Sequence, residues 1–234
     1  TTLPDGAQRR ATKLVKSLID NRLTKYNLDG HDVGDLPAGR RILVPGQVED
    51  DASIRLGAAE VNTNLGLLKA TRAANPAAVI IYKPHPDVEA GLRQGGVADA
   101  LAYADFVASN ADPVALIDVV DEVWTMTSLI GFEALLRDRK VTCLGTPFYA
   151  GWGLTDDRAL PNLRRVATPS IAQLAHAVLI DYPRYFDPKT GLACPAEVIV
   201  DRLATGDIPK GGVFNRTVAK LQGLFASYAH VWRR

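Results

Sequence analysis

The sequence has few of the features that mark secreted, membrane-spanning or metal-binding proteins. Only two cysteines occur in 234 residues, Cys143 and Cys194, and neither has the spacing of a metal ligand, so we expect reduced thiols. No apolar run approaches the roughly 20 residues that cross a bilayer. Residues 1–10 are polar and basic, which is unlike a signal peptide.

An excess of charge of one sign is also missing. The chain has 27 basic and 26 acidic side chains and a net charge of +1. This balance gives no electrostatic argument for binding to nucleic acid or to a membrane surface. The hydrophobic share of 47% is ordinary for a globular protein, and the length fits one large domain or two small ones.

Strand and helix patterns alternate up to residue 144. This alternation through short connections predicts an α/β fold, a Rossmann-like doubly wound parallel sheet with flanking helices. In such a sheet, ligands bind beyond the carboxyl ends of the strands. The expected strands are residues 41–45, 78–82, 106–109, 122–126 and 141–144, and the expected helices are residues 7–21, 62–75, 87–93, 113–120 and 129–137.

The alternation stops beyond residue 145. Residues 147–157 are rich in glycine and aromatic side chains and predict a loop. Helices are expected over residues 170–180, 197–203 and 215–232, with a loop over 182–194.

Lys83 and His85 follow the strongest expected strand, within the sequence Tyr-Lys-Pro-His-Pro. A cation and an imidazole at the carboxyl edge of a sheet suit a phosphate or a carboxylate. The alternative is a rigid turn, stiffened by Pro84 and Pro86, in which the histidine merely caps backbone groups.

Thr127 and Ser128 stand where the strand over 122–126 passes into a helix, and Glu133 follows within that helix. Free amides and the helix dipole at this point favour an anion, and the two hydroxyls add donors. The alternatives are simple N-capping by Ser128 and a solvated Glu133.

Gln47 precedes three consecutive carboxylates, Glu49, Asp50 and Asp51, after the first expected strand. Carboxylates at a sheet edge can supply a base or a nucleophile. The alternative is a solvated acidic turn.

Residues 145–153 combine glycines with three aromatic side chains. They could form a mobile lid over a ligand, or the aromatic rings could simply pack over the edge of the sheet. These groups all follow strand ends of one sheet, where a single ligand would touch them together.

Three segments resemble the bacterial capsule polysaccharide biosynthesis and export proteins, which are β-Kdo transferases that build the Kdo linker on the capsule's lipid anchor. They are KPHPD at residues 83–87, TSLIGFEALL at 127–136 and GTPFYAGWGLT at 145–155. The likeness runs from about the first helix to Leu203. The first two segments are also similar to motifs of bacterial sialyltransferases, which use CMP-linked donors.

The resemblance implies a donor-binding role for six residues. His85, with Lys83 beside it, is implied to contact the CMP phosphate, and Thr127 and Ser128 to form a second phosphate clamp. Glu133 is implied to bind the nucleotide or its ribose. Gln47 is counted with them, because it opens the Gln-x-x-x-Asp spacing of the family.

Asp51 closes that spacing and is implied to be the catalytic aspartate. Because the family retains anomeric configuration through a covalent sugar adduct, Asp51 would be the nucleophile, with Asp50 as a close rival. No metal or cofactor is implied besides the substrate CMP-Kdo, since CMP leaves readily.

The resemblance also implies a GT-B type fold, two Rossmann-like domains facing a cleft. This chain would be the second, donor-binding half, and would lack the first domain of its module. The implied bounds are a linking helix over residues 1–26, a nucleotide-sugar-binding domain over 27–205 and a helical tail over 206–234. The implied partners are the CMP-Kdo donor, a lipid-linked glycan acceptor and the missing N-terminal domain, with no nucleic acid. The implied location is the cytoplasm, with a peripheral place at the inner membrane as the alternative.

Two other functions compete with a transferase. One is a non-catalytic nucleotide-binding or assembly module of the capsule export machinery. The other is a UDP-sugar enzyme such as an epimerase, against which stands the absence of a Gly-x-Gly-x-x-Gly fingerprint after the first strand.

The sequence does not begin with Met, and we expect a fragment of a longer protein. We predict that the isolated 234-residue chain transfers no sugar, because the acceptor-side half is missing. The measurement is transfer from CMP-Kdo to a suitable acceptor, and robust transfer by this chain alone would contradict the prediction.

Overall fold

The computed structural model describes residues 3–25 and 33–209. Its contacts divide the chain into two compact units, Thr1–Pro183 and Arg184–Arg234. The boundaries at residues 26 and 205 that the resemblance implies stay a prediction. The helix expected over residues 215–232 lies outside the described residues.

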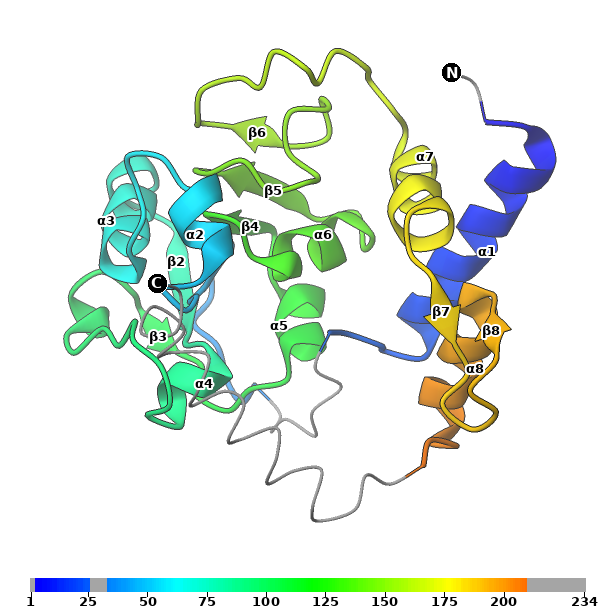
Figure 1. Ribbon diagram of the computed structural model, residues 1–234. Helices are drawn as coiled ribbons and strands as arrows, with labels where there is room; N and C mark the ends of the chain where they lie inside the picture. Colours follow the sequence, from blue (N-terminus) through cyan, green and yellow to red (C-terminus); the bar gives the residue numbers. More distant parts are fainter. Residues whose placement is uncertain (1–2, 26–32, 210–234) are drawn as a thin grey trace, which may run out of the picture. The chain divides into compact units, whose positions relative to one another are not determined.

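The first unit is built on a six-stranded, fully parallel sheet, which confirms the predicted fold class (Figure 1). The strand order is β3-β2-β1-β4-β5-β6, the order of a doubly wound Rossmann sheet. The strands are β1 Arg41–Pro45, β2 Val79–Lys83, β3 Phe106–Val107, β4 Glu122–Thr125, β5 Lys140–Cys143 and β6 Asp156–Asp157.

Helices cover both faces of this sheet (Figure 1). Because side chains alternate along a strand, Ile42 and Val44 of β1 enter one core and Leu43 enters the other. The first core includes Ile54, Leu67 and Leu68 from the helices on its side. The helices on that face are α2 Ala52–Gly57 and α3 Asn64–Ala74, and those on the other are α1 Asp5–Asp20, α5 Pro113–Val119, α6 Leu129–Leu135 and α7 Ile171–His176.

Several elements differ from the sequence-based expectation. The helix expected over residues 87–93 is the single turn α4, Pro86–Glu89, because Gly91 adopts a positive φ of 68° directly after it. The helix expected over residues 170–180 is α7 followed by a π-helical turn, Ala177–Asp181. The short helix α2, the strand β6 and a 3-10 turn, Ala100–Ala102, have no counterpart among the expected elements.

The second unit contains a β-hairpin where a loop is expected over residues 182–194. Strand β7, Tyr185–Phe186, pairs antiparallel with β8, Ala193–Cys194, and helix α8, Ala196–Thr205, follows. Asp187 is buried in the hairpin turn and accepts hydrogen bonds from the Lys189 N–H and the Arg202 guanidinium. This side chain holds the turn and the helix together, which a hydropathy pattern cannot indicate.

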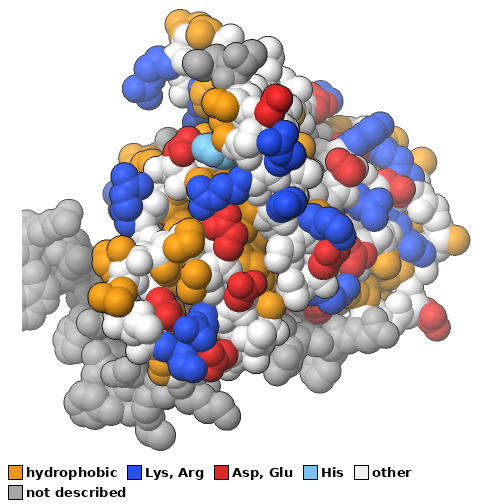
Figure 2. All heavy atoms as spheres, turned by 90° about the vertical axis from the view of Figure 1, so that its right-hand side faces the viewer, with side chains coloured by type: hydrophobic (Ala, Val, Ile, Leu, Met, Phe, Trp, Pro, Cys, Tyr) orange, Lys and Arg blue, Asp and Glu red, His pale blue; other side chains and the backbone are white. Residues whose placement is uncertain are grey.

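On the face of the molecule that Figure 2 shows, basic and acidic side chains are interspersed, and neither sign forms a large patch. This mixture agrees with the net charge of +1. Within the described ranges, no helix is long and apolar enough to cross a membrane.

The chain leaves β1 and β4, which are neighbours in the sheet, toward opposite faces. The segment after β1 leads into α2, and the segment after β4 leads into α6. Where connections diverge in this way, a crevice opens at the carboxyl end of the sheet. The fold therefore places a ligand site between the β1 and β4 loops.

Glu122 is a buried carboxylate at the opposite, amino-terminal end of β4. It accepts hydrogen bonds from Trp124 Nε1 at 2.6 Å and Thr142 Oγ1 at 2.7 Å, and it pairs with the guanidinium of Arg40. Two buried donors and one half-exposed cation thus depend on a single side chain that joins β4 to β5.

We predict that Glu122→Ala lowers the free energy of unfolding by about 3 kcal/mol, because the Trp124 and Thr142 donors lose their acceptor inside the protein. Urea unfolding followed by circular dichroism measures the change. The matched control is Glu60→Ala, at an exposed glutamate, which should change stability by no more than about 0.5 kcal/mol. Equal stabilities of the two variants would contradict the role assigned to Glu122.

Candidate functional site

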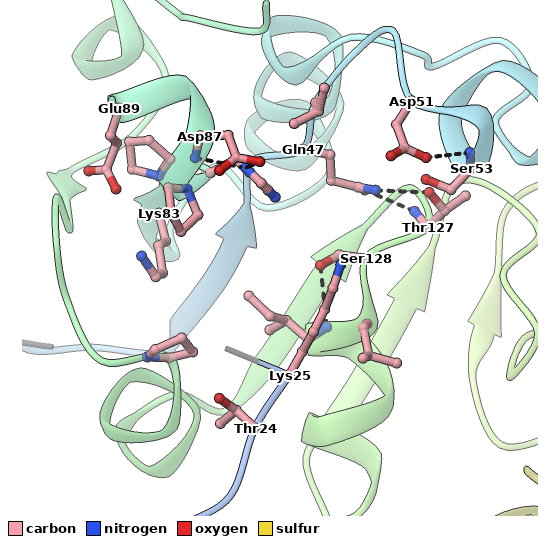
Figure 3. A pocket seen from close by; sticks show the side chains of 18 of the residues that line it. Thr24, Lys25, Gln47, Asp51, Ser53, Lys83, Asp87, Glu89, Thr127 and Ser128 are labelled. Atoms are coloured by element: carbon pink, nitrogen blue, oxygen red, sulfur yellow. Dashed lines mark hydrogen bonds and ion pairs between the residues drawn. The ribbon is translucent and has the colours of Figure 1, made fainter. Parts of the chain in front are cut away.

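A pocket of about 640 Å³ opens at the carboxyl ends of β1, β2 and β4 (Figure 3). Side chains from the β1–α2 loop, the β2–α4 loop and the start of α6 line it. All seven residues singled out in the sequence contribute to this lining: Gln47, Asp51, Lys83, His85, Thr127, Ser128 and Glu133. The fold brings them together, and their roles toward a ligand stay predictions.

Gln47 joins the two loops across the crevice. Its side chain is 6% exposed, its Nε2 donates to Thr127 Oγ1 at 2.8 Å, and its Oε1 accepts from the Thr127 N–H at 3.0 Å. The backbone of Gln47 is fixed in turn by Asn64, whose side-chain amide accepts from its N–H and donates to its carbonyl, both at 2.8 Å. With its amide engaged on both sides, Gln47 holds the pocket wall in place.

The three carboxylates after Gln47 face different surroundings. Glu49 accepts a hydrogen bond from the Asn64 N–H at 2.7 Å, and Asp50 forms an ion pair with Arg93 at 2.8 Å. Of the three, only Asp51 lines the pocket. Asp50 and Asp51 are exposed in this turn, as the alternative considered from the sequence expects, and each also has a partner within the protein.

Asp51 caps helix α2, since its Oδ1 accepts the Ser53 N–H at 2.8 Å (Figure 3). This hydrogen bond is the main reason why the pKa of Asp51 is lowered, and the charges of Arg93 and Lys25 lower it further, against a smaller opposing effect of burial. Asp51 is therefore a carboxylate at neutral pH. Its side chain is exposed to the pocket and not sequestered in the core.

Lys83 is the last residue of β2 and is 4% exposed. Burial lowers the pKa of its ammonium, while the negative charges of Glu89 and Asp112 oppose that shift. No hydrogen bond or ion pair joins Lys83 Nζ to another of the described residues, and the side chain lines the pocket. A buried cation of this kind attracts an anion strongly, because the surrounding dielectric is low.

His85 both caps a helix and lines the pocket. Its Nδ1 accepts the Asp87 N–H at 3.1 Å, which makes it the N-cap of α4. Burial lowers the pKa of the imidazole, although the nearby Asp87 opposes this shift. The lowered pKa favours the neutral ring at pH 7, and because Nδ1 accepts, the proton of the neutral ring sits on Nε2.

Three of the amides around the start of α6 are bonded within the protein. The Thr127 N–H donates to Gln47, the Ser128 N–H to Thr125 Oγ1, and the Ile130 N–H to Ser128 Oγ. Ser128 is an N-cap, as one reading of the sequence proposed. The hydroxyl groups of this segment line the pocket, and the anion site expected here stays a prediction.

Glu133 is 7% exposed, which excludes the solvated helix residue considered from the sequence. Its Oε1 accepts the Lys25 N–H at 2.9 Å. Burial raises the pKa of Glu133, and the Lys25 N–H and the nearby Arg137 oppose that shift. Glu133 thereby ties the segment after α1 to the pocket wall.

The aromatic loop after β5 is divided between core and pocket. Tyr149 is fully buried, its hydroxyl donates to the Ser128 carbonyl, and a Cβ added at Gly131 would lie 2.8 Å from its ring. The space at Gly131 thus accommodates Tyr149 and not a ligand. Phe148, by contrast, is 41% exposed and lines the pocket, while Trp152 donates to its carbonyl at 2.7 Å.

Sequence reasoning missed several lining residues. Thr24 and Lys25 enter from the segment after α1, Arg93 and Glu89 from the segment after β2, and Asn110 from the segment after β3. Lys25 and Arg93 belong to no motif and reach the pocket only through tertiary contacts. Among the described residues, no group of three His, Cys, Asp or Glu side chains could hold a metal ion, and independence from a metal stays a prediction.

Two curated bacterial proteins are similar to this chain. The capsule polysaccharide modification protein LipA of Neisseria meningitidis serogroup A is 46% identical over 228 residues, 93% of this chain and 32% of LipA. The lipopolysaccharide-processing protein LpsZ of Rhizobium meliloti is 44% identical over 210 residues, 87% of this chain and 47% of LpsZ. The chain thus spans less than half the length of these curated relatives.

Two solved structures of KpsC from Thermosulfurimonas dismutans share the fold. The β-Kdo 2,7 transferase is 35% identical with a TM-score of 0.74, over 88% of this chain and 63% of that one. The β-Kdo 2,4 transferase is 31% identical with a TM-score of 0.77, over 87% of this chain and 64% of that one. This similarity confirms the Rossmann-like half of a GT-B type fold.

The family match is carried by the same part of the chain that forms the sheet and the pocket. The sequence model of the capsule polysaccharide biosynthesis proteins matches residues 6–185. Together with the relatives above, it confirms the resemblance drawn from the three motifs. The chain belongs to the capsule polysaccharide biosynthesis protein family.

Proposed function

We propose that this chain is the donor-binding part of a retaining β-Kdo glycosyltransferase that uses CMP-Kdo. The full enzyme would build the poly-Kdo linker of capsular polysaccharide on its lipid anchor. One observation carries the proposal: a buried cation, a neutral imidazole, two hydroxyls and an ionised aspartate line one pocket at the crevice of the sheet. The KpsC relatives, whose names state β-Kdo transfer, support the donor class.

The CMP phosphate would lie between the β2 and β4 loops. Lys83 Nζ supplies positive charge from a buried position, and His85 Nε2–H and the hydroxyls of Thr127 and Ser128 supply hydrogen bonds. These donors stabilise the negative charge that grows on the phosphate as the sugar departs, and they do so in a low-dielectric setting. Glu133, at the pocket wall beside Lys25, would accept from the ribose hydroxyls.

Asp51 would act as the nucleophile. One of its oxygens forms a bond to the anomeric carbon of Kdo while the bond from that carbon to the phosphate oxygen breaks, and CMP leaves with the bonding electrons. The hydroxyl oxygen of the acceptor then attacks the same carbon, loses its proton to solvent, and frees Asp51 as a carboxylate. Two inversions give net retention. The Ser53 N–H keeps Asp51 ionised and hence nucleophilic.

The binding prediction concerns His85. We expect calorimetry to show that CMP binds this chain more tightly than UMP or AMP, and that His85→Ala weakens CMP binding by about 1–3 kcal/mol through loss of the Nε2–H donor. The matched variant is His85→Asn, whose side-chain oxygen can still cap α4 but whose Nε2 donor is gone. His85→Asn should be as stable as the wild type, and its affinity for CMP should fall as much as that of His85→Ala.

Equal affinity for all three nucleotides would contradict the cytidine assignment. An unchanged dissociation constant in both His85 variants would leave this residue as a helix cap alone.

The catalytic prediction concerns Asp51 in the full-length enzyme. Asp51→Asn should retain the cap on α2, since asparagine caps helices as well as aspartate does, and should lower transfer at least about a thousandfold. Intact-mass measurement after addition of CMP-Kdo, followed by peptide mapping, should locate a Kdo adduct on Asp51. Asp50→Asn, which removes only the ion pair with Arg93, should still transfer sugar.

An adduct on Asp50, or full activity of Asp51→Asn, would remove Asp51 from the mechanism. CMP binding without transfer by the wild-type full-length enzyme would instead favour the non-catalytic assembly module.

A further inference from the structure

Arg93 is a pocket residue to which neither the motifs nor the phosphate clamp assign a role. It follows the short helix α4 and lines the same pocket as Asp51. Its guanidinium is 30% exposed, and Nη2 lies 2.8 Å from Asp50 Oδ1. Its Nε–H is buried and has no hydrogen-bond partner among the residues that the structure describes.

The segment that carries Arg93 is fixed to the loop that carries Asp51. The Glu49 N–H donates to the Gln94 carbonyl at 3.3 Å. Asn64 Nδ2 donates to both the Gly95 carbonyl and the Gln47 carbonyl at 2.8 Å. These bonds, together with the ion pair between Arg93 and Asp50, join the segment of Arg93 to the loop of Asp51, and both side chains line the same pocket.

The charge of Arg93 already acts on Asp51. The Ser53 N–H bond lowers the Asp51 pKa most, and among the side-chain charges Arg93 comes ahead of Lys25 in lowering it further. Lys25 enters the pocket from another side, since its backbone is bonded to Glu133. Arg93 is thus the cation coupled most closely to the proposed nucleophile.

We propose that Arg93 binds a carboxylate carried by the anomeric carbon of the donor sugar, and so selects 2-ulosonate donors over ordinary aldose donors. The inference rests on the proposed function, because it takes Asp51 as the group beside the anomeric carbon. In a 2-ulosonate the carboxyl carbon is bonded directly to the anomeric carbon. A guanidinium that lines the same pocket as Asp51, and that pairs with the neighbouring Asp50, is a suitable partner for that carboxylate.

Electrostatics gives Arg93 a second effect on the reaction. An aspartate that attacks a carbon bearing a carboxylate brings two negative charges together, which is unfavourable. A guanidinium between them neutralises part of this repulsion and can bind a carboxylate through two parallel N–H bonds. Arg93 is accordingly a specificity-determining residue that touches the substrate.

The test compares two ligands in the same pocket by calorimetry with this chain. CMP has the phosphate but no sugar carboxylate, whereas CMP-Kdo has both. The quantity of interest is the ratio of the CMP dissociation constant to the CMP-Kdo dissociation constant. Arg93→Gln should lower this ratio by about ten- to a hundredfold and leave CMP binding within about twofold of wild type. Arg93→Lys keeps the positive charge but loses the two parallel N–H donors of the guanidinium. Its ratio should lie between those of the wild type and Arg93→Gln.

Asp50→Asn is the matched control, because it breaks the same ion pair and keeps the guanidinium. The ratio should stay at or above the wild-type value in this variant. If Asp50→Asn lowers the ratio as much as Arg93→Gln does, or if Arg93→Gln leaves the ratio unchanged, the inference is wrong and Arg93 only supports the loop. A Lys25→Ala variant that lowers the ratio while Arg93→Gln does not would assign the carboxylate to Lys25.

Failure of the proposed function has a different signature. Wild-type chain that binds neither CMP nor CMP-Kdo would overturn the donor assignment and the inference with it. Wild-type chain that binds CMP, with a ratio insensitive to Arg93, would overturn the inference alone.

Discussion

The site depends on one interaction, the pair of hydrogen bonds between the side-chain amide of Gln47 and Thr127. Parallel doubly wound sheets open at the point where neighbouring strands send their connections to opposite faces, and here those strands are β1 and β4. The same crevice that admits a ligand would leave the two loops unconnected. Gln47 closes this gap by donating to the Thr127 hydroxyl and accepting from the Thr127 N–H, so the loop after β1 and the segment between β4 and α6 are fixed to each other.

Capping gives the site residues defined roles. Asp51, His85 and Ser128 each cap the helix that follows them, and each also lines the pocket. A cap fixes the side-chain direction and the protonation state together: Asp51 stays ionised, and the imidazole keeps its proton on the nitrogen that does not accept. The structural and the ligand-binding readings of these residues are therefore compatible, and variants that preserve the cap separate them.

The sequence contains enough information for strands β1 to β5 and for the motif residues, and too little for β6 and for the rest of the pocket. The apolar runs over residues 41–45 and 78–82 predict β1 and β2, because strands covered on both faces must be continuously apolar. Lys25 and Arg93 have no periodicity and no motif, and only the packing of distant segments brings them in. The bonded Thr127 N–H before α6 likewise depends on Gln47, about 80 residues away in the chain.

The most direct test of the whole account is a crystal structure of this chain with CMP bound. The account predicts the phosphate within hydrogen-bond distance of His85 Nε2, Lys83 Nζ and the Ser128 hydroxyl, with the Asp51 carboxylate facing the empty sugar position. A phosphate held instead by Lys25 and Glu133 alone, or CMP bound outside the crevice between the β1 and β4 loops, would contradict it.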